Sequence, residues 1–276
     1  MDTSALLPQV MTIAEEAGKA VMAIYDRPDE LHIESKADTT PVTDADLEAH
    51  RLICDRLRQL TPEIPILSEE SPAEEILQRR QWRRYWLIDP LDGTKEFIKR
   101  NGEFTVNIAL IDNHRSVLGV VHVPATATTY AGSLSQDAIK RGANGEEEQI
   151  HCRPLDAAGG MTLLTSRSHI DDRQDQYIQQ LEQLAALTVK GVGSSLKLCL
   201  IAEGQADLHL RLGRTCEWDT GAAQAVLEAA GGKVMDLLMQ PLNYNQKSDL
   251  YNPDFIAIAD PEVNWAEHLN LEQPLS

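Results

Sequence analysis

Asp89 and Asp92 stand three residues apart in the segment D-P-L-D-G-T, at the end of an apolar run with the character of a buried strand. Pro90 fixes its own backbone torsion and Gly93 permits a turn that other residues resist, so both carboxylates can face one point. The Leu91 carbonyl, once released from strand pairing, could face the same point. Hard divalent cations such as Mg²⁺ prefer oxygen ligands of this kind. The spacing therefore predicts a metal site at this corner.

A simpler interpretation of paired aspartates is a turn in which both side chains are solvated. For D-x-x-D alone, the two interpretations carry about equal weight. The full pattern D-P-x-D-G-T changes this balance, because a chance match is expected in on the order of one chain in several thousand of this size. Neither a P-loop pattern nor an EF-hand spacing competes with it. We therefore favour the metal site.

Four further acidic residues could join this site. Glu69 and Glu70 follow the apolar run I-P-I-L, and Asp219 lies in the small-residue segment E-W-D-T-G-A-A. Asp46 follows Thr43 by three positions. Each has a simpler explanation, since S-E-E is usually a solvated loop, an aspartate can stabilise a helix start, and T-x-x-D is the pattern of a capping box. Their joint occurrence with D-P-L-D-G-T is the argument for one shared site.

The charge balance limits the partners of the chain. Its 276 residues include 43 acidic and 25 basic ones, a formal net charge of -18, which argues against non-specific nucleic-acid binding. We expect no membrane-spanning segment, no signal peptide and, from four widely spaced cysteines without a C-x-x-C motif, reduced thiols in the cytoplasm rather than a zinc site. Peripheral association with a membrane surface and the oligomeric state, monomer or homodimer, stay open.

The first half of the chain reads as helices followed by strands. Apolar residues recur at three- and four-residue spacing between Leu7 and Ile24, which predicts an amphipathic helix. A second helix is expected from Thr43 to about Thr61, with the following residues facing inward: Leu47, Cys54, Leu57 and Leu60. Strands are expected at 64–67, 85–88, 104–111 and 117–123.

The second half alternates between helices and strands. The polar stretch K-R-G-A-N-G-E-E-E at 140–148 is either a surface loop at a boundary between two halves or a hairpin tip, with about equal weight. Strands are expected at 161–165, 187–192, 208–212 and 255–259. Helices are expected at 175–187, at 195–203 and from about residue 218. The composition and these elements predict a two-part α/β enzyme.

Three segments carry a family resemblance: S-E-E at 68–70, D-P-L-D-G-T at 89–94 and W-D-T-G-A-A at 218–223. In this order they resemble the inositol-monophosphatase superfamily of Mg²⁺-dependent, lithium-sensitive phosphatases. Four further segments resemble its CysQ-type 3'(2'),5'-bisphosphate nucleotidases: S-K-A-D-T-T-P-V-T-D-A-D at 35–46, the stretch 87–111, S-R-S-H at 166–169 and the stretch 193–207, which begins G-S-S-L-K. The resemblance implies an α/β fold of alternating helix and sheet layers, divided into sub-domains 1–150 and 151–276 with the metals in the cleft between them.

The resemblance also implies roles for single residues. Mg²⁺ ions, two or three per site, would be held by Glu69, Asp89, the Leu91 carbonyl, Asp92 and Asp219. The attacking water would be oriented by Asp46 and Thr94, with Glu69 as a further catalytic residue. The phosphoryl group would lie on the backbone amides of Gly93 and Thr94. The phosphate that is not cleaved would contact Ser194, Ser195 and Lys197, with weaker candidates in Lys36, Arg167 and His169. A solvated helix lysine is an equal alternative for Lys197, and an ordinary loop residue is one for His169.

The implied activity is removal of the 3'-phosphate from adenosine 3',5'-bisphosphate, giving AMP and phosphate, and its extension to the sulfated analogue 3'-phosphoadenylyl sulfate. This reaction would recycle a by-product of sulfate activation. An inositol or sugar phosphatase of the same superfamily is the alternative within the class. A metal-dependent binding protein without turnover is the alternative from another class.

Overall fold

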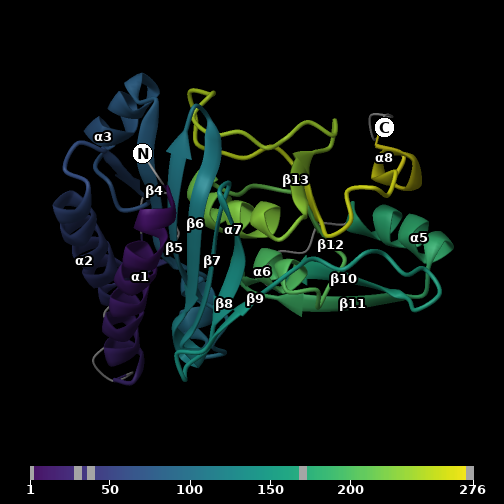
Figure 1. Cartoon of the computed structure of the whole chain (residues 1–276), viewed down its shortest axis with the longest axis horizontal. Coiled ribbons are helices and arrows are strands. Elements are labelled where there is room, and N and C mark those ends of the chain that lie inside the picture. Colours follow the sequence, from purple (N-terminus) through teal and green to yellow (C-terminus); the bar gives the residue numbers. More distant parts are fainter. Residues whose placement is uncertain (1–2, 28–32, 36–40, 168–172, 272–276) are drawn as a thin grey trace.

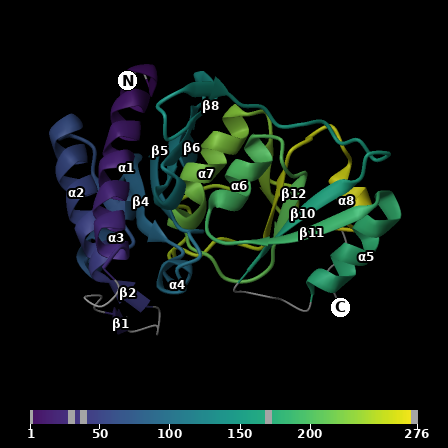
Figure 2. The same cartoon turned by 90° about the horizontal axis from the view of Figure 1, so that it is seen from below.

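The computed structural model describes residues 3–27, 33–35, 41–167 and 173–271. Helices and sheets alternate in layers along the longest axis (Figures 1 and 2). Helices α1 (Thr3–Tyr25) and α2 (Asp44–Leu60) cover one face of a seven-stranded sheet, and α6 (Leu196–Ala202) and α7 (Glu217–Ala229) lie between it and a five-stranded sheet. Helices α5 (Gln174–Leu184) and α8 (Trp265–His268) pack on the outer face of the second sheet. The α/β layered fold predicted from the sequence is therefore present.

The seven-stranded sheet keeps its strands in chain order. Its strands are β3 (Ile66–Ser68), β4 (Arg84–Asp92), β5 (Thr105–Asp112), β6 (Arg115–Val123), β7 (Thr128–Ser133), β8 (Gln136–Arg141) and β9 (Glu147–Gln149). Only the β3–β4 pair is parallel among these neighbours. Short elements flank it: β1 (Ile33–Ser35), β2 (Pro41–Thr43), α3 (Ala73–Gln78) and α4 (Thr94–Ile98).

The five-stranded sheet has the order β11-β10-β12-β14-β13. Its strands are β10 (Met161–Ser166), β11 (Leu187–Val192), β12 (Leu208–Arg211), β13 (Lys233–Asp236) and β14 (Phe255–Ile258). Strand β10 runs parallel to both β11 and β12, while β14 is antiparallel to its neighbours. All strands of the first sheet precede residue 150 and all strands of the second follow it, which supports our proposed sub-domains 1–150 and 151–276.

Strand β4 is buried on both faces because helices cover each side of its sheet. Its odd-numbered residues Tyr85 and Leu87 join the core shared with α6 and α7, and Trp86 and Ile88 join the core under α1 and α2. This is why the strand reads as one apolar run rather than as an alternation. The strand end that carries the aspartates is thereby held from both sides.

Helix α7 approaches the first sheet at three glycines. A Cβ atom at Gly119 would collide with the Ala222 carbonyl, and one at Gly132 would lie 2.7 Å from Ala229 Cβ. On the helix itself, a Cβ atom at Gly221 would lie 3.1 Å from a methyl carbon of Leu87. Small residues at the contact let the helix and sheet backbones come close. The start of α7, which carries Asp219, is thus held beside the strand that carries Asp89 and Asp92.

Most expected elements are present within a few residues, including the two N-terminal helices and the helix that starts near residue 218. Two expectations need correction. Leu47 does not face inward, because its side chain is 50% exposed on the outer face of α2. The stretch 140–148 forms the tip between β8 and β9, which pair antiparallel, so the hairpin alternative is correct. No helix in the described ranges combines the length and apolar character needed to cross a bilayer.

Candidate active site

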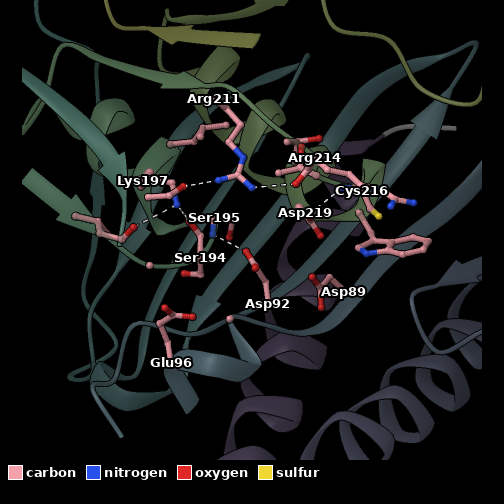
Figure 3. A pocket seen from close by; sticks show the side chains of 18 of the residues that line it. Asp89, Asp92, Glu96, Ser194, Ser195, Lys197, Arg211, Arg214, Cys216 and Asp219 are labelled. Atoms are coloured by element: carbon pink, nitrogen blue, oxygen red, sulfur yellow. Dashed lines mark hydrogen bonds between the residues drawn. The ribbon is translucent and has the colours of Figure 1, made fainter. Parts of the chain in front are cut away.

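A pocket of about 600 Å³ opens between the two sheets, at the end of β4 and the starts of α6 and α7. Carboxylates and cations both line it, and Asp89 lies on the side opposite Lys197 (Figure 3). The acidic lining residues include Glu69, Asp89, Asp92 and Asp219, and the basic ones include Lys197, Arg211 and Arg214. Segments from both halves of the chain therefore build one site.

The turn that carries the two aspartates is a bulge within β4. Asp89 pairs with Asn107 and Asp92 with Thr105, and the register shifts between these pairs. The Leu91 amide donates to Asp89 Oδ1 at 3.0 Å, which fixes the orientation of that carboxylate. The predicted corner therefore lies inside the strand and not after its end, because β5 continues to pair with Asp92.

Gly93 follows the bulge with a φ of 91°, a left-handed conformation that favours glycine. A Cβ atom at Gly93 would also lie 3.1 Å from the Glu103 carbonyl oxygen. Helix α4 begins at the next residue, Thr94. Gly93 thus allows the chain to turn from strand to helix immediately beside Asp92.

Asp46 connects the start of α2 to this turn. Its Oδ2 accepts a hydrogen bond from the Thr43 amide at 2.8 Å, as in a capping box, and a further one from the Thr43 hydroxyl at 2.7 Å. Its Oδ1 accepts a hydrogen bond from the Thr94 hydroxyl at 3.2 Å, and the Leu91 carbonyl lies 3.3 Å from the same hydroxyl. The capping explanation and the site explanation for Asp46 are therefore compatible, since each uses a different oxygen.

Backbone amides also orient the other two aspartates. Asp219, in the first turn of α7, accepts a hydrogen bond from the Cys216 amide at 2.8 Å. Asp92 Oδ2 accepts one from the Ser195 amide at 2.5 Å. Figure 3 shows both side chains and Asp89 directed toward the same part of the pocket. The structure brings together the predicted carboxylates from three separate segments.

Burial makes the ionised forms of these carboxylates unfavourable. It raises the pKa of Asp46 and of Asp92 to about 6, and Lys197 opposes the effect at Asp92. The pKa values of Asp89 and Asp219 are raised well above their ordinary range by burial and, next, by neighbouring carboxylates that include Glu69 and Asp92. A bound cation would stabilise the ionised forms of these carboxylates.

This donor set fits a hard divalent cation, since it consists of carboxylate oxygens with one backbone carbonyl and a surplus of negative charge. In the described part of the chain, no three His, Cys, Asp or Glu side chains are already arranged closely enough to hold an ion. Cation binding would therefore have to draw the carboxylates together.

The segment G-S-S at 193–195 lies against the turn that carries Asp92 and Gly93. The Ser195 hydroxyl is buried and forms hydrogen bonds of 2.8 Å with Thr105 Oγ1 and Asn107 Oδ1. We expected this side chain to contact a phosphate. In the structure its hydroxyl instead contacts two residues of β5. Ser194, in a left-handed conformation with φ of 48°, lines the pocket instead.

Lys197 is buried, so the solvated-lysine alternative is wrong. Its Nζ donates to the carbonyl oxygens of Ser194 at 2.5 Å and Val192 at 3.4 Å. Burial lowers the pKa of Lys197 to about 8, while the nearby Asp92 carboxylate acts in the opposite direction. The ammonium group therefore lies between the G-S-S segment and the carboxylates.

Arg167 lines the pocket but is held by Glu103. Its Nε and Nη2 donate to the two oxygens of Glu103 at 2.8 and 2.6 Å, and Nη2 also donates to the Gly191 carbonyl. Glu103 accepts a further hydrogen bond from the Gly193 amide at 2.7 Å. The remaining two substrate candidates, Lys36 and His169, lie outside the described residues.

Sequence reasoning missed several side chains of the pocket, among them His209, Arg211 and Arg214. Arg211 Nη1 donates to Ser166 Oγ at 2.7 Å and Nη2 to the Arg214 carbonyl at 2.9 Å. The Arg214 guanidinium lies 3.5 Å from the centre of the Tyr251 ring. The available signal was the strand L-H-L-R, in which polar residues alternate with leucines although both faces of the strand are buried.

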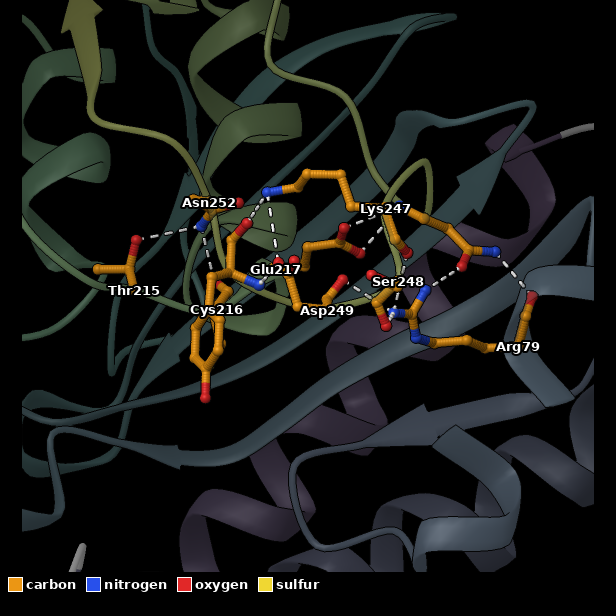
Figure 4. A network of polar contacts seen from close by, with 10 residues as sticks. Arg79, Thr215, Cys216, Glu217, Lys247, Ser248, Asp249 and Asn252 are labelled. Carbon is orange, nitrogen blue, oxygen red and sulfur yellow. Dashed lines mark hydrogen bonds and ion pairs between the residues drawn. The ribbon is translucent and has the colours of Figure 1, made fainter. Parts of the chain in front are cut away.

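A second network of polar contacts surrounds Glu217 in the first turn of α7 (Figure 4). Arg79 is buried and donates to the carbonyl oxygens of Lys247, Ser248 and Asp249. The backbone N–H of Asn245 donates to both oxygens of Glu217 at 2.9 Å. Because Glu217 is two residues before Asp219, this network helps to set where the site carboxylate lies.

Known proteins place the chain in a family. The model of the inositol monophosphatase family matches residues 2–269. The 3'(2'),5'-bisphosphate nucleotidase CysQ of Escherichia coli strain K12 is 48% identical over 250 residues, covering 91% of this chain and 98% of the relative. The protein of the same description from Haemophilus influenzae is 37% identical over 265 residues, covering 94% and 95%.

A solved structure agrees with these relatives. The crystal structure of CysQ from Bacteroides thetaiotaomicron, a bacterial member of the inositol monophosphatase family, has a TM-score of 0.78 to this chain at 38% identity. The similarity covers 91% of this chain and 96% of that one. The order S-E-E, D-P-L-D-G-T and W-D-T-G-A-A, the layered fold and these matches all agree. The chain belongs to the inositol monophosphatase family.

Proposed function

We propose that this chain is a metal-dependent 3'(2'),5'-bisphosphate nucleotidase that releases the 3'-phosphate of adenosine 3',5'-bisphosphate and leaves AMP. The observation that carries the proposal is the two-sided pocket, with a carboxylate cluster near Asp89 and buried cations at Lys197 and Arg211. A substrate with two phosphate groups can use both sides at once. The 48% identity to a CysQ nucleotidase supports the same substrate class. The sulfated analogue 3'-phosphoadenylyl sulfate is a second candidate substrate.

We assign the metal ligands to Glu69, Asp89, the Leu91 carbonyl, Asp92 and Asp219. Divalent cations bound there, Mg²⁺ in our proposal and two or three in number, would neutralise the phosphoryl oxygens and lower the pKa of the attacking water. The chain itself contributes preorganisation, because amide hydrogen bonds hold Asp89, Asp92 and Asp219 in place before the substrate arrives.

We assign Asp46 and Thr94 to the attacking water, with Glu69 as a further catalytic residue. The Thr94 hydroxyl donates its proton toward Asp46 Oδ1, so its oxygen is left to accept a hydrogen bond from a water molecule. This arrangement fixes the direction in which the water lone pair points. Asp46 is fixed in turn by Thr43, so the orientation is set at the start of α2.

The substrate phosphates have separate places in this proposal. We assign the phosphoryl group that is cleaved to the backbone amides of Gly93 and Thr94, next to the carboxylates. We assign the other phosphate to Ser194, Lys197 and Arg211 across the pocket. Arg167 would reach it only by leaving Glu103, and Lys36 and His169 remain predictions from the sequence. The cytoplasmic location also remains a prediction.

Phosphate release tests the proposal. The purified protein is assayed with Mg²⁺ on adenosine 3',5'-bisphosphate, inositol 1-phosphate and fructose 1,6-bisphosphate, each with and without Li⁺. We expect lithium-sensitive release from the nucleotide at a rate well above that from the other two. Preference for the inositol or sugar phosphate would keep the metal site and reject the nucleotide assignment. No release from any of them would indicate a binding protein.

A further inference from the structure

His209 is a buried imidazole on the wall of the pocket, with 1% of its surface exposed. It lies on β12 two residues before Arg211, so both side chains point to the same face of the sheet. The intervening Leu210 points to the opposite face, into the core with α5 and α8. The face with His209 turns toward α6, which supplies Lys197. The Lys197–His209–Arg211 wall is therefore a set of three nitrogen-bearing side chains.

The hydrogen bond of His209 determines its tautomer. Nδ1 lies 2.7 Å from the carbonyl oxygen of Leu164, and a carbonyl can only accept, so Nδ1 carries the hydrogen. In the neutral imidazole, Nε2 is then an acceptor. Within the described ranges, no residue forms a hydrogen bond with Nε2, and this atom is not sealed from the pocket space. An acceptor with no protein partner at the edge of a pocket can take a hydrogen bond from water, and equally from a ligand that brings a donor.

The surroundings keep His209 neutral before a ligand binds. Burial lowers its pKa well below the ordinary value, and the Lys197 ammonium and Arg211 guanidinium add to this effect. The Leu164 carbonyl on β10 acts in the opposite direction, and the Phe255 ring on β14 packs edge-on at 6.0 Å without contributing charge. Near neutral pH the wall therefore has two cations and one bare lone pair.

This combination creates a conflict for a phosphate. The two cations attract its oxygens, but a dianionic phosphate brings only acceptors to Nε2. One proton placed between a phosphate oxygen and Nε2 resolves the conflict. Once the phosphate is present, its charge also offsets the repulsion that Lys197 and Arg211 exert on an imidazolium. Phosphate and proton should therefore bind together.

We propose that the Lys197–His209–Arg211 wall binds the phosphate that is not hydrolysed together with one proton, which His209 Nε2 and a phosphate oxygen share. The inference rests on the proposed function for the identity of the ligand, a nucleoside 5'-phosphate. The proton comes from the solvent, and no covalent bond to phosphorus forms or breaks. His209 therefore contributes to specificity. It favours a ligand oxygen that can share a proton, because any other ligand oxygen would leave the Nε2 lone pair without a donor.

Calorimetric titration with AMP counts the proton directly. AMP carries the 5'-phosphate and has no 3'-phosphate to lose. At about pH 7 most of the free phosphate is dianionic, because its second pKa is about 6, and Lys197, with a pKa of about 8, is still largely protonated and takes up little of its own. Binding heats in buffers of different ionisation enthalpy give the protons taken up. We expect the wild type to take up close to one proton per AMP, and adenosine, which has no phosphate, to take up none through this wall.

The variant His209→Asn is the matched control. An asparagine amide can donate to the Leu164 carbonyl as Nδ1 does, but it has no atom at the position of Nε2 and does not titrate. We expect it to fold with a melting temperature close to that of the wild type and to lose the proton uptake. The wild type alone gives a second measure that needs no variant. Between about pH 6.5 and 7.5, below the pKa of about 8 of Lys197, its dissociation constant for AMP should rise by about tenfold.

Three outcomes would overturn the inference. One is equal proton uptake in the wild type and the variant, including zero in both. Another is a dissociation constant of the wild type that does not change with pH. The third is a wild type that hydrolyses adenosine 3',5'-bisphosphate but does not bind AMP. The proposed function is judged separately by phosphate release, so a nucleotidase without linked proton uptake would reject only the role of His209.

Discussion

Replacing Asp92 with asparagine should stabilise the metal-free protein and remove its hydrolytic activity. The Asp92 carboxyl lies among other carboxylates, and burial raises its pKa from 3.8 to about 6. Asparagine has nearly the same shape, carries no charge, and can still accept the Ser195 hydrogen bond through its amide oxygen. The substitution therefore removes a charge without removing packing.

The expected gain follows from linkage. A pKa that is higher in the folded state gives a stabilising contribution that is fully present below the unfolded value of 3.8 and is lost as the pH rises past about 6. Near pH 8 the loss is complete, at roughly 1.4 kcal/mol per pKa unit, or about 3 kcal/mol. The side chain keeps some contact with solvent, and Lys197 loses an attractive neighbour. We therefore expect a net gain of about 1 to 2 kcal/mol in the free energy of unfolding.

Denaturant unfolding near pH 8, with chelator and then with Mg²⁺, measures this gain. With chelator the variant should be more stable than the wild type. With Mg²⁺ the order should reverse, because a ligand stabilises only the state that binds it and the variant has lost a charged metal ligand. Phosphate release should fall by at least about 100-fold, which corresponds to about 2.7 kcal/mol of transition-state stabilisation.

The control is Asp55→Asn on α2, where the carboxylate is 52% exposed and should change stability by less than about 0.5 kcal/mol. The reasoning is refuted by a chelated Asp92 variant that is less stable than the wild type. It is also refuted by equal Mg²⁺ stabilisation and equal activity at saturating Mg²⁺, since these would show that Asp92 is not a metal ligand.

Three more substitutions test other parts of the site and fold. Lys197→Ala should raise KM at least about tenfold for adenosine 3',5'-bisphosphate and far less for a simple monophosphate, whereas parallel losses would mean a structural role. Ser195→Ala should lower the free energy of unfolding by about 1 to 2 kcal/mol and raise the Mg²⁺ needed for half activity; a higher KM with unchanged stability would instead make Ser195 a substrate contact. His122 has its pKa lowered to about 4 by burial, so stability should fall as the pH drops from about 6.5 toward 4, by about 2 kcal/mol at pH 5. In urea unfolding, His122→Asn should lose less stability than the wild type as the pH falls. An equal loss in both proteins would show that His122 is not the group responsible.

Local patterns carry much of what the sequence predicts correctly. The capping box at Thr43 and Asp46 depends on residues three apart, and it is present as expected. The helices and most strands are likewise predicted from the spacing of apolar residues within one segment. Leu47 shows the limit of this signal, because an apolar residue at a helical position can still lie on the exposed side. Periodicity predicts a face but does not show what covers it.

Contacts between distant segments could not be predicted in this way. Ser195 lies in a segment typical of phosphate binding, yet its hydroxyl contacts Thr105 and Asn107, about 90 residues earlier in the chain. Arg79 and Asn245 likewise meet across 166 residues. No spacing rule connects such residues, because their proximity depends on how the two sheets pack. The carboxylates were found only because each lies in its own recognisable local pattern.

The net negative charge of the chain explains why cations are needed on both sides of the pocket. A chain with a net charge of -18 repels a bisphosphate unless cations line the place where it binds. In our proposal, bound metal ions supply them on the side of Asp89, and Lys197 and Arg211 supply them on the other. Lys197 and the Ser195 amide both interact with Asp92, so the two sides are electrostatically coupled. In our proposal, a metal ion that draws Asp92 toward itself would weaken its attraction for Lys197 and leave the ammonium group for the substrate phosphate, so we expect nucleotide to bind more tightly when the metal is present.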